Sequence, residues 1–215
     1  MKHITFYFDV ISPYAYLAFE QLPQALQGIS HSVTYKPVLF GAMLQHFGQL
    51  GPAEIAPKRT WTYRQINWLA KQQGASLHMP ANHPFNPLGL LRLAVACGKE
   101  GRCNRYVAET LFRHVWQGGL DAGDAQRLQA LAGQLKPARS HDDPNVKAEL
   151  KANTDVAIAK GIFGVPMMEV DGEAFWGLDA LPMLRAYLEV DEWFVSSQWL
   201  AAGDLPTGVV RKKMS

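Results

Sequence analysis

The sequence predicts an α/β fold in which a long all-helical insertion interrupts a small mixed sheet. Strand-like segments occur only near the two ends of the chain, at residues 4–10, 31–40 and 165–176. Segments with helical periodicity fill the stretch 41–160, which contains no convincing strand. The chain also begins in the order strand, helix, strand, and this order makes a right-handed crossover between two parallel strands.

Composition and charge describe an ordinary globular protein. The 215 residues are 48% hydrophobic and 19% charged with a net charge of +2, so nothing points to nucleic acid or to an acidic partner. No apolar run approaches the roughly 20 residues of a membrane span, and we expect no secretory signal. Cys97 and Cys103 form neither a CxxC nor a metal pattern. We therefore expect two reduced thiols between neighbouring helices, no metal site, a solvated basic tail at 211–213 and a cytoplasmic protein.

The first half of the sheet is predicted from two segments and the helix between them. The strand at 4–10 is β-branched and aromatic throughout, as expected when both faces are buried. Ser12 then has the position of a helix N-cap, with Pro13 as the first helical residue. This helix should fade near Gly28, and the alternating segment 31–40 is predicted as a second strand.

The insertion is predicted to consist of helices and loops alone. It begins with a short helix and loop at 41–52, followed by a helix at 57–74 that ends at Gly74. A proline-rich loop then leads to further helices. Their predicted ranges are 86–99, 104–118, 124–135 and 143–161, the last opened by an aspartate cap and a proline.

The C-terminal part is predicted as a hairpin and a helix. Segments 165–170 and 173–176 flank Asp171 and Gly172, a two-residue turn signal, and a helix follows at 178–190. Joined, the β-α-β and β-β-α halves make a four-stranded mixed sheet with helices on both faces, which is a thioredoxin-like fold. The predicted division is a thioredoxin-like domain of residues 1–40 plus 161–215 and a helical insertion domain of residues 41–160.

Ser12-Pro13-Tyr14-Ala15 lies where a thioredoxin carries its Cys-x-x-Cys pair. With Ser12 and Ala15 at those places both thiols are absent, which argues against thiol–disulfide exchange. Ser12 has two interpretations. It caps the helix, or its hydroxyl also donates a hydrogen bond to a thiolate that arrives with a bound ligand, since a helix N-terminus stabilises a thiolate.

Two later motifs are open to similar pairs of interpretations. Pro166 opens a strand and is either an ordinary trans proline or a cis proline that leaves the Val165 backbone free to pair with an extended peptide. Asp179 precedes the last predicted helix and is either a cap or a carboxylate for a ligand ammonium. In a thioredoxin fold these residues and Ser12 fall at one cleft.

Five motifs resemble the 2-hydroxychromene-2-carboxylate isomerase family, whose members are relatives of the kappa-class glutathione transferases. They are FYFDVISPYAYLAF at 6–19, GQLGPAEIAPKR at 48–59, PANHPFNP at 80–87, IFGVP at 162–166 and WGLD at 176–179. Their order and spacing agree over almost the whole chain. The resemblance implies a thioredoxin-like fold with a helical insertion, a homodimer, and glutathione as the cofactor.

The resemblance also implies a glutathione site. Ser12 matches the serine that activates the glutathione sulfur, and the backbone of Val165, before Pro166, matches the group that pairs with the cysteinyl part. The remaining matches are Leu178 and Asp179 at the γ-glutamyl end, Trp176 and Gly177 beside them, Arg59 in place of a lysine, and Gln49 in place of an asparagine.

The substrate side departs from the family pattern. Leu44 lies near the position of a lysine, Glu54 and Ile55 replace an Asn-Arg pair, and His83 replaces a tyrosine. We take these four residues as candidates for substrate binding, and they leave the natural substrate open.

One helix face in the insertion carries aromatic residues. Trp61, Arg64 and Trp68 lie at i, i+3 and i+7, which favours packing in the core over lining a pocket for an aromatic substrate. Further polar candidates near this face are Tyr63, Asn86 and Arg92.

These assignments predict a glutathione-dependent isomerase of 2-hydroxychromene-2-carboxylate or a similar aromatic carboxylate. The expected mechanism is reversible addition of the glutathione thiolate, bond rotation and elimination, so that glutathione is needed but not consumed. Two alternatives stay open. One is a kappa-like glutathione transferase or peroxidase, and the other is a protein that binds glutathione without turnover.

Overall fold

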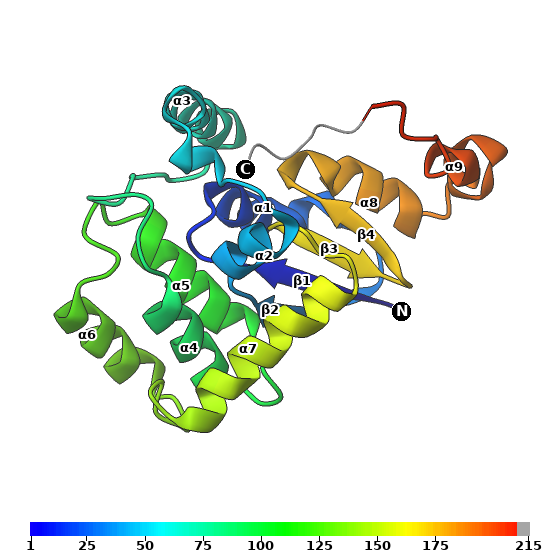
Figure 1. Ribbon diagram of the computed structural model, residues 1–215. Helices are drawn as coiled ribbons and strands as arrows, with labels where there is room; N and C mark the ends of the chain where they lie inside the picture. The colour runs from blue at the N-terminus through cyan, green and yellow to red at the C-terminus, as the bar shows by residue number, and fades with distance from the viewer. Residues whose placement is uncertain (210–215) are drawn as a thin grey trace.

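The computed structural model describes residues 1–209 and contains a four-stranded mixed sheet with helices on both faces (Figure 1). The strand order is β2-β1-β3-β4, with β1 (Lys2–Phe8) parallel to β2 (His31–Pro37). β3 (Met167–Val170) runs antiparallel to β1 and to β4 (Glu173–Trp176). The predicted sheet is confirmed, while the basic cluster at 211–213 lies outside the described residues.

The helices follow the predicted order along the chain. α1 (Pro13–Ala25) joins β1 to β2, and α8 (Leu181–Leu188) follows β4. The helices between the two halves of the sheet are α2 (Phe40–Phe47), α3 (Ala56–Gln73), α4 (Leu88–Ala96), α5 (Arg105–Trp116), α6 (Ala125–Leu135) and α7 (Pro144–Ala159). Short helical turns are η1 (Pro52–Glu54), η2 (Leu178–Ala180) and η3 (Glu192–Val195), and α9 (Ser197–Ala202) follows the last of them.

The two faces of the sheet pack against different cores because side chains alternate along β1. Phe6 and Phe8 are fully buried in the main hydrophobic cluster, which includes α1, α8 and Phe112 of α5. Tyr7 points to the opposite face and joins a smaller cluster with Met43 of α2 and residues of α7. The helices of the insertion therefore contribute to the packing on both faces.

Local signals in the sequence account for most of the element boundaries. Ser12 and Asp143 accept N-cap hydrogen bonds at the starts of α1 and α7, and a proline follows each of them. Gly74 ends α3 in the left-handed conformation. Asp171 and Gly172, with φ of 53° and 90°, form the two-residue turn between β3 and β4.

The placement of the cysteines corrects one expectation. Cys97 caps the C-terminus of α4, but Cys103 lies outside the helices, where its amide donates to the Tyr35 carbonyl of β2 at 3.0 Å. Both thiols are free. Burial raises the pKa of both, to about 11 for Cys97, so neither thiol is activated for exchange.

The aromatic face of α3 was expected in the core, and this prediction was wrong. Trp61 is 65% exposed and Trp68 is 58% exposed, whereas Thr62, Ile66 and Ala70 form the buried side of the helix. A C-terminal aromatic group was also missed by the sequence reasoning. Its rings come from Tyr187, Trp193, Phe194 and Trp199. The division into two domains stays a prediction.

Asn153 of α7 ties the insertion to the sheet, and its loss should destabilise the protein. Its side-chain amide donates to the Pro37 carbonyl at 3.0 Å and to the Gly101 carbonyl, and the residue is 5% exposed. We expect Asn153→Ala to lower the free energy of unfolding by about 2 kcal/mol, because two buried carbonyls lose their donor. Urea denaturation measures this. Asn145→Ala, at an exposed position of the same helix, is the control, and equal midpoints for the two variants would contradict the prediction.

Candidate active site

Ser12 links the start of α1 to the loop before β3. Its hydroxyl oxygen accepts from the Ala15 amide at 3.2 Å, and its hydroxyl group donates to the Val165 carbonyl at 3.4 Å. The Ser12 amide donates to the Asp9 carbonyl at 3.1 Å, which fixes the backbone. The capping role of Ser12 is therefore confirmed, and the long bond to Val165 is one that the hydroxyl can exchange for a better acceptor.

Val165 and Pro166 form the loop that faces Ser12. The peptide bond between them is cis, as the resemblance implies. Within residues 1–209 no hydrogen bond reaches the Val165 amide, whereas the Pro166 carbonyl accepts from the Gly177 amide at 3.0 Å. An amide without a partner among these residues, at a position beside a helix N-terminus, suits pairing with the backbone of an extended peptide.

The junction between β4 and α8 lies beside the Val165–Pro166 loop, at the edge of the site. Gly177 has a φ of 98°, and a Cβ there would come within 2.5 Å of a carboxylate oxygen of Asp179, so the position requires glycine. Asp179 makes no capping hydrogen bond within the described residues, which leaves its carboxylate available. The pKa of Tyr14 in α1 is raised by burial and, additionally, by the Asp179 charge, which places that carboxylate near the helix start.

Trp176 and Leu178 flank Gly177 in the chain. Trp176 is 56% exposed, and its ring meets Phe163 edge-on with centroids 5.0 Å apart. Leu178 is half-buried and lines a groove with Gln21 of α1. The structure thus gathers most of the predicted glutathione residues at one edge: Ser12, Val165, Pro166, Trp176, Gly177, Leu178 and Asp179.

Arg59 lies on α3, the helix that packs against the start of α1. It is exposed in the first turn of α3, and its charge lowers the pKa of Tyr63, which burial raises. α3 in turn contacts the first turn of α1, where the Tyr14 hydroxyl donates to Gln65 at 2.7 Å.

The other candidates on the α2–η1 segment make local hydrogen bonds. The Gln49 amide donates to the Leu44 carbonyl at 2.8 Å, and the Glu54 carboxylate accepts from the Gly51 amide. Within the described residues no hydrogen bond joins them, or Ile55, to Ser12. The hydrogen bonds of the structure thus leave the relation of Leu44, Gln49, Glu54 and Ile55 to Ser12 a prediction.

His83 supports the loop that carries Ser12. Its Nε2 lies 2.8 Å from the Ile11 carbonyl, which can only accept, so Nε2 carries the proton. The Tyr63 hydroxyl lies 2.8 Å from both Nδ1 and the carbonyl oxygen of His83, and its proton is shared between these two acceptors. Burial lowers the pKa of His83, which keeps the ring neutral at neutral pH. The indole N–H of Trp116 donates to the carbonyl of Val10, the residue before Ile11, at 2.9 Å.

Asp9 is a functional candidate that the sequence reasoning missed. It is fully buried, and its two carboxylate oxygens accept from the amides of Ile11 and Phe40, each at 3.0 Å. Burial raises the pKa of Asp9 to about 7, although these backbone bonds lower it. An acidic residue at the end of an otherwise apolar strand was the signal that could have identified it.

Two kinds of feature are absent from residues 1–209. No helix in this part of the chain is both long and apolar enough to cross a membrane. The same residues contain no cluster of three or more His, Cys, Asp or Glu side chains placed to hold a metal ion.

Comparisons with known proteins show the family and the fold of this chain. The family model of the DSBA-like thioredoxin domain matches residues 3–189. A 2-hydroxychromene-2-carboxylate isomerase of Sphingobium xenophagum is 30% identical over 198 residues, which cover 87% of this chain and 98% of that protein. Glutathione s-transferase kappa 2 of Caenorhabditis elegans is 25% identical, covering 87% and 92% of the two chains. A solved structure of 2-hydroxychromene-2-carboxylate isomerase has the same fold, with a TM-score of 0.77, 23% identity, and coverage of 91% and 100%.

The pKa of Asp9 predicts a pH-dependent stability. Between an unfolded pKa near 4 and a folded pKa of about 7, the native state binds more protons, so the free energy of unfolding falls as the pH rises through this window. His114, with a pKa lowered to about 4 mainly by burial, acts in the opposite direction. The test is therefore the difference in the free energy of unfolding between the wild type and Asp9→Asn, measured by urea denaturation at each pH. We expect this difference to shift by about 2 kcal/mol between pH 5 and pH 7 and to level off above pH 8. A free energy of unfolding that changes with pH in the same way in both proteins would contradict the raised pKa of Asp9.

The hydrogen bonds of His83 predict that it holds the Ser12 loop in place. His83→Phe keeps a ring but removes both hydrogen bonds, and we expect the free energy of unfolding to fall by about 1–3 kcal/mol. Amide hydrogen exchange should also accelerate at Ile11 and Ser12 more than at the far end of α1. His46→Phe, at an exposed position, is the control. Unchanged exchange at these two amides would show that His83 does not position the loop.

Proposed function

Because this chain belongs to the 2-hydroxychromene-2-carboxylate isomerase family, within the DSBA-like thioredoxin domains, we propose that it is a glutathione-dependent isomerase. Its proposed substrate is 2-hydroxychromene-2-carboxylate or a similar aromatic carboxylate. The observation that carries the proposal is the position of Ser12. A hydroxyl in place of the nucleophilic thiol lies at the N-terminus of α1, 3.4 Å from the Val165 carbonyl.

The residues around Ser12 fit glutathione, a peptide with a thiol, an ammonium and two carboxylates. The Val165 amide, which has no hydrogen bond to any described residue, suits the backbone of the cysteinyl part. The available carboxylate of Asp179 suits the ammonium of the γ-glutamyl part, and exposed Arg59 suits a carboxylate. Leu178, Gly177, Trp176 and Gln49 are the further proposed contacts.

When bound, glutathione supplies a thiolate nucleophile that adds reversibly to an electrophilic carbon, so that a stiff double bond becomes free to rotate. The N-terminus of α1 stabilises negative charge at this point through its unpaired N–H groups. The Ser12 hydroxyl can turn its proton from the distant Val165 carbonyl to a charged sulfur, since a charged acceptor makes a stronger hydrogen bond. The Ala15 amide keeps the oxygen in place during this exchange.

The substrate side is proposed to lie between α3 and the α2–η1 segment. Leu44 and Ile55 are half-buried there, and Glu54 is exposed. Both ring nitrogens of His83 face protein partners, so we propose that its contribution is mainly to position the Ser12 loop. The differences from the family pattern at these residues are the reason why the substrate is given as a class.

A homodimer and a cytoplasmic location complete the proposal. The homodimer comes from the family resemblance, whereas the cytoplasmic location comes from the cysteine usage, because two free thiols suit a reducing compartment. The similarity to a kappa-class glutathione transferase supports a second candidate function, conjugation or reduction of electrophiles. Consumption of glutathione distinguishes the two activities.

Equilibration of 2-hydroxychromene-2-carboxylate with its open-chain benzylidenepyruvate isomer tests the function. We expect ultraviolet absorbance to show fast equilibration only with glutathione, and thiol titration to show no loss of glutathione. Loss of thiol would favour the transferase. Binding of glutathione without any reaction would show a different substrate or a protein that only binds.

Ser12→Ala tests the proposed role of the hydroxyl. We expect kcat/KM to fall about 100-fold or more, the loss typical of removing one transition-state hydrogen bond. Ser12→Ala also removes an N-cap, worth about 1 kcal/mol of stability. Ser196→Ala is the matched control, because Ser196 caps α9 by the same contact, a 3.2 Å bond from the Trp199 amide. Equal activities of the two variants would contradict the role of Ser12.

A further inference from the structure

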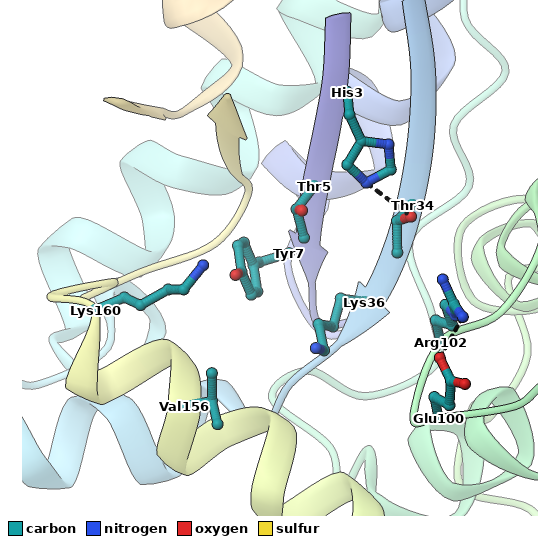
Figure 2. Close-up of a pocket in the computed structure, with 9 residues that line it drawn as sticks. All are labelled: His3, Thr5, Tyr7, Thr34, Lys36, Glu100, Arg102, Val156 and Lys160. Atoms are coloured by element: carbon teal, nitrogen blue, oxygen red, sulfur yellow. Dashed lines mark hydrogen bonds and ion pairs between the residues drawn. The ribbon is translucent and has the colours of Figure 1, made fainter. Parts of the chain in front are cut away.

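A second pocket lies on the sheet, away from Ser12 (Figure 2). Ser12 follows the C-terminal end of β1, whereas this pocket runs along the strand from His3 through Thr5 to Tyr7, on the face opposite Phe6. Its volume is about 240 Å³. The small cluster around Tyr7 covers only one end of this face, so the remainder is polar and open.

The walls of the pocket come from three separate parts of the chain. β2 contributes Thr34 and Lys36, which alternate onto the same face as the β1 residues. Lys160 follows the last residue of α7 as its C-cap, and the loop before α5 contributes Glu100 and Arg102. Figure 2 shows the three cationic side chains arranged around the strands.

The charges in and beside the pocket do not balance. Arg102 is paired with Glu100, and Lys160 contacts both carboxylate oxygens of Glu169 at 2.7 and 2.8 Å. Lys36 makes no salt bridge with any residue in 1–209. Among the lysine, arginine and glutamate side chains, three cations and two carboxylates leave one positive charge unmatched.

The surroundings of Lys36 make this excess charge significant. Its ammonium is partly buried, and its pKa is lowered by that burial and by the charges of Lys160 and Arg102, although Glu169 acts in the opposite direction. A lysine held near two other cations without its own acidic partner gains from an added anion. Thr5 and Thr34 add hydroxyl groups that can donate to the same anion.

We propose that this pocket binds a phosphate group, held by Lys36 together with Arg102 and Lys160. A tetrahedral oxyanion can accept hydrogen bonds from three cations in different directions at once. A carboxylate is less suited to this arrangement. The phosphate comes either as the free ion or as part of a small phosphomonoester. The pocket serves as a second ligand site, independent of the glutathione site at Ser12.

Titration of the full chain by two-dimensional amide NMR tests the proposal. Inorganic phosphate, glycerol 3-phosphate and acetate are added in turn, with chloride holding the ionic strength constant. We expect saturable shifts at Thr5, Thr34 and Lys36 for the phosphates, and at least ten-fold weaker binding of acetate. Tighter binding of the monoester than of the free ion would identify a phosphorylated metabolite as the ligand, and the reverse would identify inorganic phosphate.

Charge variants make the test specific. Lys36→Met should raise the Kd for phosphate at least ten-fold, whereas Lys36→Arg should keep it within about three-fold. Lys151→Met is the matched control, because Lys151 lies on α7, is paired with Asp155 and does not line the pocket. Shifts centred on α1, shifts that do not saturate, or equal Kd values for Lys36→Met and Lys151→Met would overturn the proposal. Glutathione binding should be unchanged in all three variants, so this outcome does not depend on the proposed isomerase activity.

Discussion

One side-chain hydroxyl connects the two halves of the sheet at the candidate site. Ser12 ends the first crossover loop, Val165 precedes the second half of the sheet, and 153 positions of sequence separate them. The entire helical insertion lies between these two residues. The site therefore exists only when the insertion returns the chain to β1, and the antiparallel pairing of β1 with β3 fixes that return.

The loop before Ser12 is held from several directions, which makes the position of the hydroxyl a property of the whole fold. The Asp9 carboxylate accepts a hydrogen bond from the Phe40 amide at the start of α2. His83 and Trp116 donate to the neighbouring carbonyls of Ile11 and Val10. Tyr63 connects His83 to α3. Tyr63, His83 and Trp116 come from different parts of the insertion, while Asp9 follows β1. The insertion consequently contributes to the rigidity of the site even where it does not line it, and rigid positioning is what a catalytic hydrogen bond requires.

The sequence was informative where local chemistry decides the structure. Caps such as Ser12 and Asp143, the Asp171-Gly172 turn and the periodicity of the helices predicted nearly every element. The sequence did not predict features that depend on packing between distant parts of the chain. Periodicity put Trp61 and Trp68 on one face of α3, but it contained no information on which face the rest of the protein covers. The cluster at Ser12 was predictable because the thioredoxin topology places the ends of β1 and the start of β3 together. The partners of Asp9 and His83 were not, because they depend on loops of the insertion.

The missing thiols do not remove the electrostatics that thiol chemistry uses. A helix N-terminus favours negative charge on whatever atom lies in front of it, and α1 keeps this property with Ser12 and Ala15 in place of two cysteines. The thiols that the chain does carry, Cys97 and Cys103, are in surroundings that raise their pKa and suppress the thiolate. Under the proposed function the sulfur belongs to a bound peptide, and the chain supplies the charge-stabilising helix, the Ser12 hydroxyl and the Val165 amide, which has no hydrogen bond within residues 1–209. A reversible reaction then needs no reduction of the protein between turnovers, because no cysteine of the chain changes its oxidation state.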